Sequence, residues 1–203
     1  MGRPLSVHYK TLRSRLGELR RRFLPRQFSA TGVYREHQLD RARAYRVLCH
    51  AEVESYIEAR VQQISDAAIK QWKSNRKVCR ALLGLILVDG EAKWPHKNVT
   101  ADFISQRIDS CHRRFLGAIK DNHGLKEKHV VALLLRIGYD CHTLSPALLV
   151  ELNAFGGKRG AIAHSSSAKL VAAAIDPQTE LQAVESIVIS LEIIDRELGD
   201  LLK

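Results

Sequence analysis

The chain has 203 residues, of which 45% are apolar and 27% are charged, and its formal net charge is +10. This composition excludes wholesale disorder, and the length suits a single domain with one substantial core. The longest apolar run, residues 81–88, is too short to cross a bilayer, and the N-terminus lacks the apolar segment of a secretory signal. A cytoplasmic protein with no membrane partner is therefore predicted.

Apolar residues recur at helical spacing along nearly the whole chain. Pro25 is expected to end the first helix, and Thr100 is a suitable cap for a later one. A capping residue followed by proline, at Ser145 and again at Asp176, marks the start of each of the last two helices. The predicted helices lie, in chain order, at residues 9–23, 36–74, 78–88, 100–122 and 126–138, from Ser145 into Gly156 and Gly157, and from Asp176 onwards.

These patterns predict an all-α protein. No segment alternates between apolar and polar residues with the period of a β-strand. Residues 78–88 are apolar nearly all round, which predicts a short helix inside the core. The expected fold is one bundle of about six to seven helices with a long second and a long final helix. Residues 1–35 form its basic N-terminal helix and turn, and residues 36–203 form the core bundle.

Charge is unevenly distributed along the chain. Residues 1–26 carry eight basic side chains and one acidic one, whereas residues 176–203 carry seven acidic and two basic ones. The basic segment suits nucleic acid, with Arg20, Arg21 and Arg22 as candidate RNA-binding residues, or the acidic final helix of another chain. A solvated helix face is the alternative interpretation of the same residues.

Cysteine spacing raises the question of a metal site. Cys49, Cys79, Cys111 and Cys141 lie at nearly regular intervals, and three of them precede a histidine, which suggests zinc as one interpretation. Adjacent residues on a helix point about 100° apart, however, and no C-x2-C or H-x3-H spacing occurs. Reduced thiols in the core are the preferred interpretation, and no metal or cofactor is predicted.

Residues 156–166 give the most definite indication of chemistry. They place Arg159 and His164 five positions apart among glycines and alanines, just before a run of serines. Arginine is a permanently charged, forked ligand for phosphate, and histidine can transfer protons near neutral pH, so the pair could bind and cleave a phosphodiester. Chance alone should supply about one such pair, and the sequence contains three: Arg3 and His8, Arg107 and His112, and Arg159 and His164.

Context favours the third pair. The first lies at the terminus beside a proline, and the second would be about 140° apart on one helix, as expected for a solvated flank. The third lies beside glycines and alanines, which let a ligand or a second chain approach closely. For this pair to act together, the helix must start or bend near Gly160, or Arg159 must reach around it.

A polar strip is predicted on the second helix. Arg46, His50 and Glu54 lie four positions apart and therefore share one face. They could line the active site, with Glu54 orienting a catalytic histidine or arginine, although a surface ladder of ion pairs is the slightly preferred interpretation. Lys158 and Ser165, on either side of the Arg159 and His164 pair, are candidate phosphate contacts or, equally, solvated residues at a helix end.

The sequence of residues 158–165 resembles the Arg-Asn-x-x-Ala-His signature of the HEPN domain family. Two further stretches, residues 43–56 and 122–129, are similar to the HEPN subgroup found with RiboL-PSP and related defence proteins. The resemblance covers about residues 36–200. It implies an RNA-cleaving or RNA-binding protein, usually a dimer in which two signature motifs meet at the interface.

By this resemblance, Arg159 and His164 are the catalytic pair of a metal-independent endoribonuclease that acts as a homodimer in a defence or toxin setting. An antitoxin or another defence-system protein would be a further partner. Gly160 stands where the family often has asparagine, which favours a second interpretation: a non-catalytic module that binds RNA or protein. A third is a helical adaptor whose basic N-terminus docks onto an acidic protein.

Overall fold

The computed structural model describes residues 4–88, 100–163 and 175–203, with only the backbone described for residues 158–163. All regular structure in these ranges is helical, which confirms the all-α prediction for this part of the chain. The helices are α1 (Val7–Phe23), α2 (Glu36–Asn75), α3 (Arg80–Val88), α4 (Ala101–Lys120), α5 (Glu127–Arg136), η1 (Cys141–Thr143), α6 (Pro146–Ala163), α8 (Pro177–Leu198) and η2 (Gly199–Leu202). Not one of these helices has both the length and the apolar character to cross a membrane.

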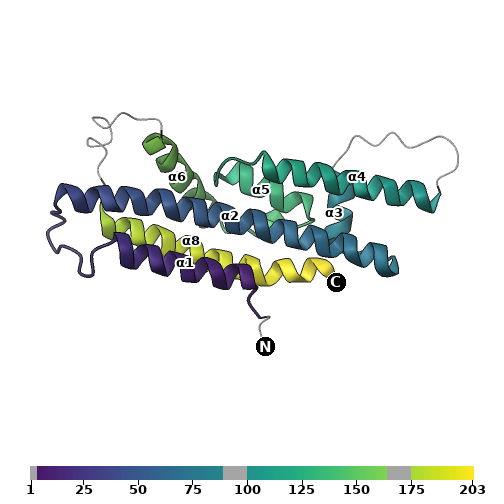
Figure 1. The fold of residues 1–203 in the computed structure, drawn as a ribbon, viewed down its shortest axis with the longest axis horizontal. Helices are drawn as coiled ribbons and strands as arrows, with labels where there is room; N and C mark the ends of the chain where they lie inside the picture. The colour runs from purple at the N-terminus through teal and green to yellow at the C-terminus, as the bar shows by residue number, and fades with distance from the viewer. Residues whose placement is uncertain (1–3, 89–99, 164–174) are drawn as a thin grey trace.

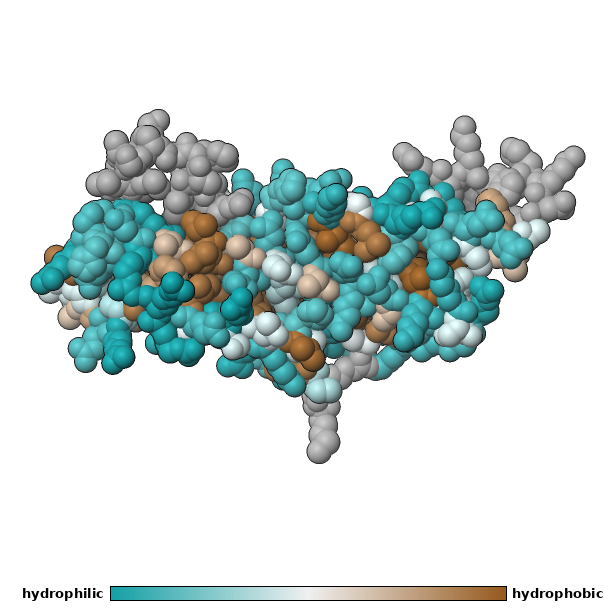
Figure 2. All heavy atoms as spheres, in the orientation of Figure 1, coloured by the Kyte–Doolittle hydropathy of each residue, from teal (hydrophilic) through white to brown (hydrophobic). Residues whose placement is uncertain are grey.

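The long helix α2 forms the axis of the molecule (Figure 1). Helices α1 and α8 run along one side of it, and α4, α5 and α6 lie on the other. Buried side chains of α2, among them Tyr45, Val53 and Ile64, pack with buried apolar side chains from both sides to form one continuous core. The face shown in Figure 2 is mainly hydrophilic, with apolar residues in separate patches.

Three predicted helix starts are confirmed in atomic detail. In each, the side chain of the capping residue accepts a hydrogen bond from the backbone N–H three residues further on. The distances are 3.2 Å at Thr100, 3.1 Å at Ser145 and 2.7 Å at Asp176. Each such cap stabilises its helix by about 1 kcal/mol, because it satisfies a donor that the helix itself leaves unpaired.

Helix α3 differs from its prediction. Ala81, Leu82 and Leu85 are buried, but the side chains of Leu83 and Leu87 are 46% and 75% exposed. A helix buried all round was therefore the wrong expectation. The inner face of α3 packs against α2, α4 and α5, and its outer face lies at the surface although it is also apolar.

The contact between α3 and the end of α5 depends on glycine. A Cβ atom at Gly84 would lie 2.1 Å from the backbone nitrogen of Gly138, and Gly138 itself has a φ of 71°. We expect Gly84→Ala to lower the free energy of unfolding by at least about 1–3 kcal/mol, because backbone rather than a flexible side chain must move. Urea denaturation would measure the change.

Gly117→Ala on α4 is the matched control. A Cβ atom at Gly117 would have nothing within 4 Å, so this change should raise the free energy of unfolding by about 0.5–1 kcal/mol through helix propensity. Equal effects of the two substitutions would show that the close approach at Gly84 does not limit stability.

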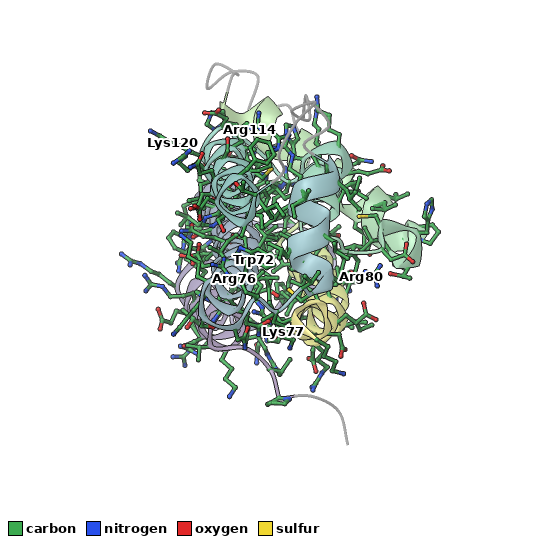
Figure 3. All side chains as sticks on the ribbon, turned by 90° about the vertical axis from the view of Figure 1, so that its right-hand side faces the viewer. Trp72, Arg76, Lys77, Arg80, Arg114 and Lys120 are labelled. Atoms are coloured by element: carbon green, nitrogen blue, oxygen red, sulfur yellow. The ribbon has the colours of Figure 1, made fainter. Side chains whose placement is uncertain are left out.

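The C-terminal end of α2 is fixed to its neighbours (Figure 3). Arg76 has a left-handed φ of 58°, and its guanidinium lies over the Trp72 ring, 5.3 Å from the centroid. Nη1 of Arg76 donates to Ser105 Oγ on α4 at 3.1 Å, and Lys77 Nζ donates to the backbone oxygen of Leu202 at 3.0 Å. The end of the long helix is therefore attached both to α4 and to the C-terminal turn.

The basic first helix packs against the acidic final helix of the same chain. Arg20 lies 3.8 Å from Glu185, and the Tyr9 hydroxyl donates to the backbone oxygen of Val188 at 2.9 Å. Part of the charge asymmetry in the sequence is thus balanced within the fold, between α1 and α8.

A buried carboxylate, Asp195 of α8, joins three parts of the chain. It accepts hydrogen bonds from the backbone N–H and the hydroxyl of Ser6 at 2.7 and 2.6 Å, from Tyr56 Oη at 3.1 Å and from Arg60 Nε at 2.8 Å. Burial alone would raise the pKa of Asp195, but the Ser6 hydrogen bonds and the charge of Arg60 outweigh it and hold the pKa below its ordinary value.

Candidate functional site

Helix α6 carries the first half of the predicted catalytic pair. Its helical backbone continues through Gly160, so the helix does not start there. Arg159 and Lys158 lie on α6, in the segment for which the backbone alone is described. His164 and Ser165 lie outside the described residues, and the arrangement of Arg159 with His164 remains a prediction.

Arg46 has a different role from the surface ladder that its spacing suggested. Its side chain is buried, and Nε donates to Glu180 Oε2 at 2.6 Å, with a second guanidinium nitrogen donating to the other carboxylate oxygen. Glu180 lies in the first turn of α8 and is also buried. The prediction of a surface ion-pair ladder is therefore wrong, because Arg46 forms a buried, bidentate salt bridge between α2 and α8.

His50 lies one turn further along α2 and is held against α6. Only 1% of it is exposed, and its ring stacks on Phe155 with the centroids 5.7 Å apart and an angle of 24° between the planes. Nδ1 of His50 lies 3.5 Å from Glu54 Oε2. Glu54 therefore lies beside His50 of the same helix. The stack holds His50 against Phe155 of α6, the residue directly before Gly156.

A cavity of about 200 Å³ lies beside this stack. Residues from three separate parts of the chain meet around it: one from α2, a group from the α4–α5 connection and the start of α5, and two from α6. The described lining residues are His50, His123, Gly124, Leu125, Lys126, Lys128, His129, Gly156 and Gly157. None of these is acidic, and five carry basic side chains, so the cavity is suited to an anion.

The α4–α5 connection is fixed on both sides. Asn122 Nδ2 donates to Glu58 Oε1 on α2 at 2.9 Å. Two reciprocal hydrogen bonds, both 3.0 Å long, join Glu127 at the start of α5 to Asn153 on α6. His123 and Lys126 lie between these two anchors, on a segment that hydrogen bonds attach to α2 at one end and to α6 at the other.

Glycines shape the walls of the cavity. Gly124 has a φ of 144°, which side-chain-bearing residues rarely adopt, and it turns the chain between His123 and Leu125. A Cβ atom at Gly156 would lie 3.0 Å from Lys126 Cγ and 3.2 Å from its backbone nitrogen. Glycine at this position therefore lets α6 approach the start of α5 closely.

The pKa of His129 is lowered by its surroundings in the cavity. Partial burial lowers its pKa, and the positive charges of Lys128 and Lys126 and the neighbouring His123 lower it further. The neutral ring therefore predominates at pH 7. An anion in the cavity would oppose these effects and favour the protonated ring.

The predicted RNA-binding arginines lie elsewhere. Arg20, Arg21 and Arg22 are exposed near the end of α1, which packs against α2 and α8. Arg20 faces Glu185 of α8, and the Arg22 guanidinium lies 5.7 Å from the Phe23 ring centroid. None of the three lines the cavity, so a role in RNA binding would belong to a separate surface.

Reasoning from sequence alone missed His123, Lys126, Lys128 and His129 as functional candidates. Their stretch stood out only for its resemblance to a HEPN subgroup. A signal was available in it, because four basic side chains occur within seven residues around a glycine. What the sequence did not provide was the proximity of this stretch to His50 and Gly157, which the fold brings together.

Comparison with known proteins identifies the family. A family model described as RiboL-PSP-HEPN matches residues 12–200. No curated protein and no solved structure gives a match to the chain. The matched region extends from α1 to η2 and includes the cavity and the segment that carries Arg159. The chain therefore belongs to the RiboL-PSP-HEPN family.

Proposed function

We propose that this protein is a metal-independent endoribonuclease in which Arg159 and His164 act on RNA at an interface between two copies of the chain. One observation carries the proposal: helix α6 leads directly from the basic cavity to Arg159, the first residue of the predicted catalytic pair. Gly157 lines the cavity, and Arg159 follows two residues later on the same helix, an advance of about 3 Å along its axis. Family membership supports an RNA-directed function.

The chemistry follows from what RNA supplies. The 2′-hydroxyl beside each phosphate is an internal nucleophile. His164 would take the proton of this hydroxyl while the 2′-oxygen bonds to phosphorus, and the bond from phosphorus to the 5′-oxygen would break. A second protonated histidine would then donate a proton to the leaving 5′-oxygen. The products are a 2′,3′-cyclic phosphate and a 5′-hydroxyl.

Arg159 would bind the non-bridging phosphate oxygens as charge develops on them. A guanidinium held in advance at this position stabilises the transition state without reorganisation during the reaction. A homodimer would bring two copies of His164 together, so that one acts as base and the other as acid. Dimerisation and a role in defence are parts of the proposal that come from the family resemblance.

A substrate comparison tests the proposal. We expect the purified protein to cleave transfer RNA and total RNA in excess EDTA, and to leave an oligonucleotide with 2′-O-methyl groups throughout uncut, because the nucleophile is blocked. Mass spectrometry of the products should show 2′,3′-cyclic phosphate ends. Binding of RNA without any cleavage, at high protein concentration, would instead support the non-catalytic module, with Gly160 as the suspected cause.

A further inference from the structure

We propose that the cavity between α2, α5 and α6 binds a phosphate group of the RNA strand, with Lys126, Lys128 and His129 as its ligands. The inference rests on the proposed function only for the identity of the strand that carries the phosphate. The cavity volume of about 200 Å³ is several times the ~30 Å³ that a water molecule occupies in the liquid. A phosphate with part of its hydration shell can therefore enter.

The charges around the cavity are not balanced within the described part of the chain. Two carboxylates beside the lining residues are already engaged, since Glu127 is hydrogen-bonded to Asn153 and Glu54 lies beside His50. Lys126 and Lys128 are exposed and form no ion pair with a described carboxylate. A dianionic or monoanionic oxygen ligand would therefore gain attraction here without displacing an existing salt bridge.

Several other basic side chains of the bundle are paired with carboxylates. Arg43 lies 2.7 Å from Asp40 and 3.0 Å from Glu36, and Lys73 lies 2.9 Å from Asp109. Arg46 and Arg60 each form a buried salt bridge. The cavity differs from these places because several basic groups line one partly open space whose described lining contains no acid.

The ligand geometry is provided by a short, fixed segment. Lys126 and Lys128 lie on either side of Glu127, whose hydrogen bonds to Asn153 anchor the start of α5 to α6. His129 follows on the first turn of the same helix. The other charged and titratable groups in the described lining of the cavity are His50 from α2, His123 from the connection, and Lys126 and Lys128.

Paired double variants test the site by RNA affinity. We expect Lys126→Gln/Lys128→Gln to weaken binding of an uncleavable 2′-O-methyl oligonucleotide by about tenfold or more, and to lower the salt slope by about 0.7 for each phosphate that the protein no longer neutralises. Lys70→Gln/Lys73→Gln is the control, because it removes the same charge from exposed positions on α2, away from the cavity and from the basic segment of residues 1–26. Fluorescence anisotropy across a salt series measures both, and equal reductions in affinity in the two variants would overturn the proposal.

A second measurement uses inorganic phosphate as the probe. We expect phosphate to raise the pKa of His129 in an NMR titration of its ring protons, because the anion stabilises the protonated ring. The cavity double variant should show a raised pKa without phosphate, because the two lysine charges lower it in the wild type. A His129 titration that phosphate does not change would overturn the site.

The two proposals fail in different ways. If the wild type cleaves RNA and the two double variants bind RNA equally, the nuclease stands and the phosphate site is wrong. If the wild type leaves RNA intact but the cavity variant binds it more weakly than the control, the phosphate site stands without the nuclease. Equal affinity for oligonucleotides with and without a 5′-phosphate would indicate an internal phosphate, whereas a preference for the 5′-phosphate would indicate a terminal one.

Discussion

Replacement of His164 by alanine is expected to slow RNA cleavage by about 10²- to 10⁴-fold, the usual contribution of a positioned general acid or base. The effect should appear in single-turnover reactions with excess protein, where substrate binding does not limit the rate. Affinity for an uncleavable 2′-O-methyl oligonucleotide should be nearly unchanged, because His164 is proposed to act on the reacting atoms.

His142→Ala is the matched control, since it removes another histidine, which is exposed on η1. Arg159→Lys is a second comparison. Lysine keeps the positive charge but lacks the planar guanidinium that hydrogen-bonds to two phosphate oxygens, so it separates the role of charge from that of geometry. Cleavage by His164→Ala at the wild-type rate would remove this residue from the mechanism. A fall in melting temperature of several degrees would identify His164 mainly as a packing residue.

The second large effect is expected at Asp195. We expect Asp195→Ala to lower the free energy of unfolding by about 3–5 kcal/mol, because it leaves the buried guanidinium of Arg60 without its carboxylate and removes the acceptor for Ser6 and Tyr56. Asp109→Ala, which breaks the surface pair with Lys73, should cost less than about 1 kcal/mol. Urea denaturation at pH 7 measures both.

The pH dependence gives this expectation a second check. The pKa of Asp195 is lowered in the folded protein, so its stabilising contribution is present above the ordinary aspartate pKa of about 3.9 and is lost as the pH falls through the folded value. The stability difference between the wild type and Asp195→Ala should therefore shrink below about pH 4. The double variant Asp195→Leu/Arg60→Met should recover much of the stability at pH 7, and no recovery would show that the charge left on Arg60 is not the cause.

Local signals in the sequence were sufficient to predict that the helices exist and where several of them begin. The caps at Thr100, Ser145 and Asp176 are formed by bonds that span only three residues, so the sequence contains everything needed to predict them. Helix ends were predicted less closely. The helix predicted to run into Gly156 and Gly157 continues to residue 163, although glycine carries a cost in a helix interior. Gly156 is accounted for by the close approach of Lys126, which is a tertiary contact.

Partners distant in the sequence account for the errors. Four-residue spacing placed Arg46, His50 and Glu54 on one face correctly, but spacing does not reveal what covers that face. Glu180, which is 134 residues away, covers Arg46, and Phe155 covers His50. The outer face of α3 shows the opposite error. Its apolar composition predicted burial, but Leu83 and Leu87 are exposed in the structure.

The link between Ser6 and Asp195 has a consequence for how the molecule is made. The two residues are separated by 189 positions, so the carboxylate that fixes the start of α1 is absent until the chain has been synthesised as far as α8. Closing so large a loop carries an entropic cost and slows folding. Helices α1 and α2 therefore lack the cover of α8 until that helix has been synthesised. Completion of the bundle, and with it any activity that needs the finished fold, must follow synthesis of α8.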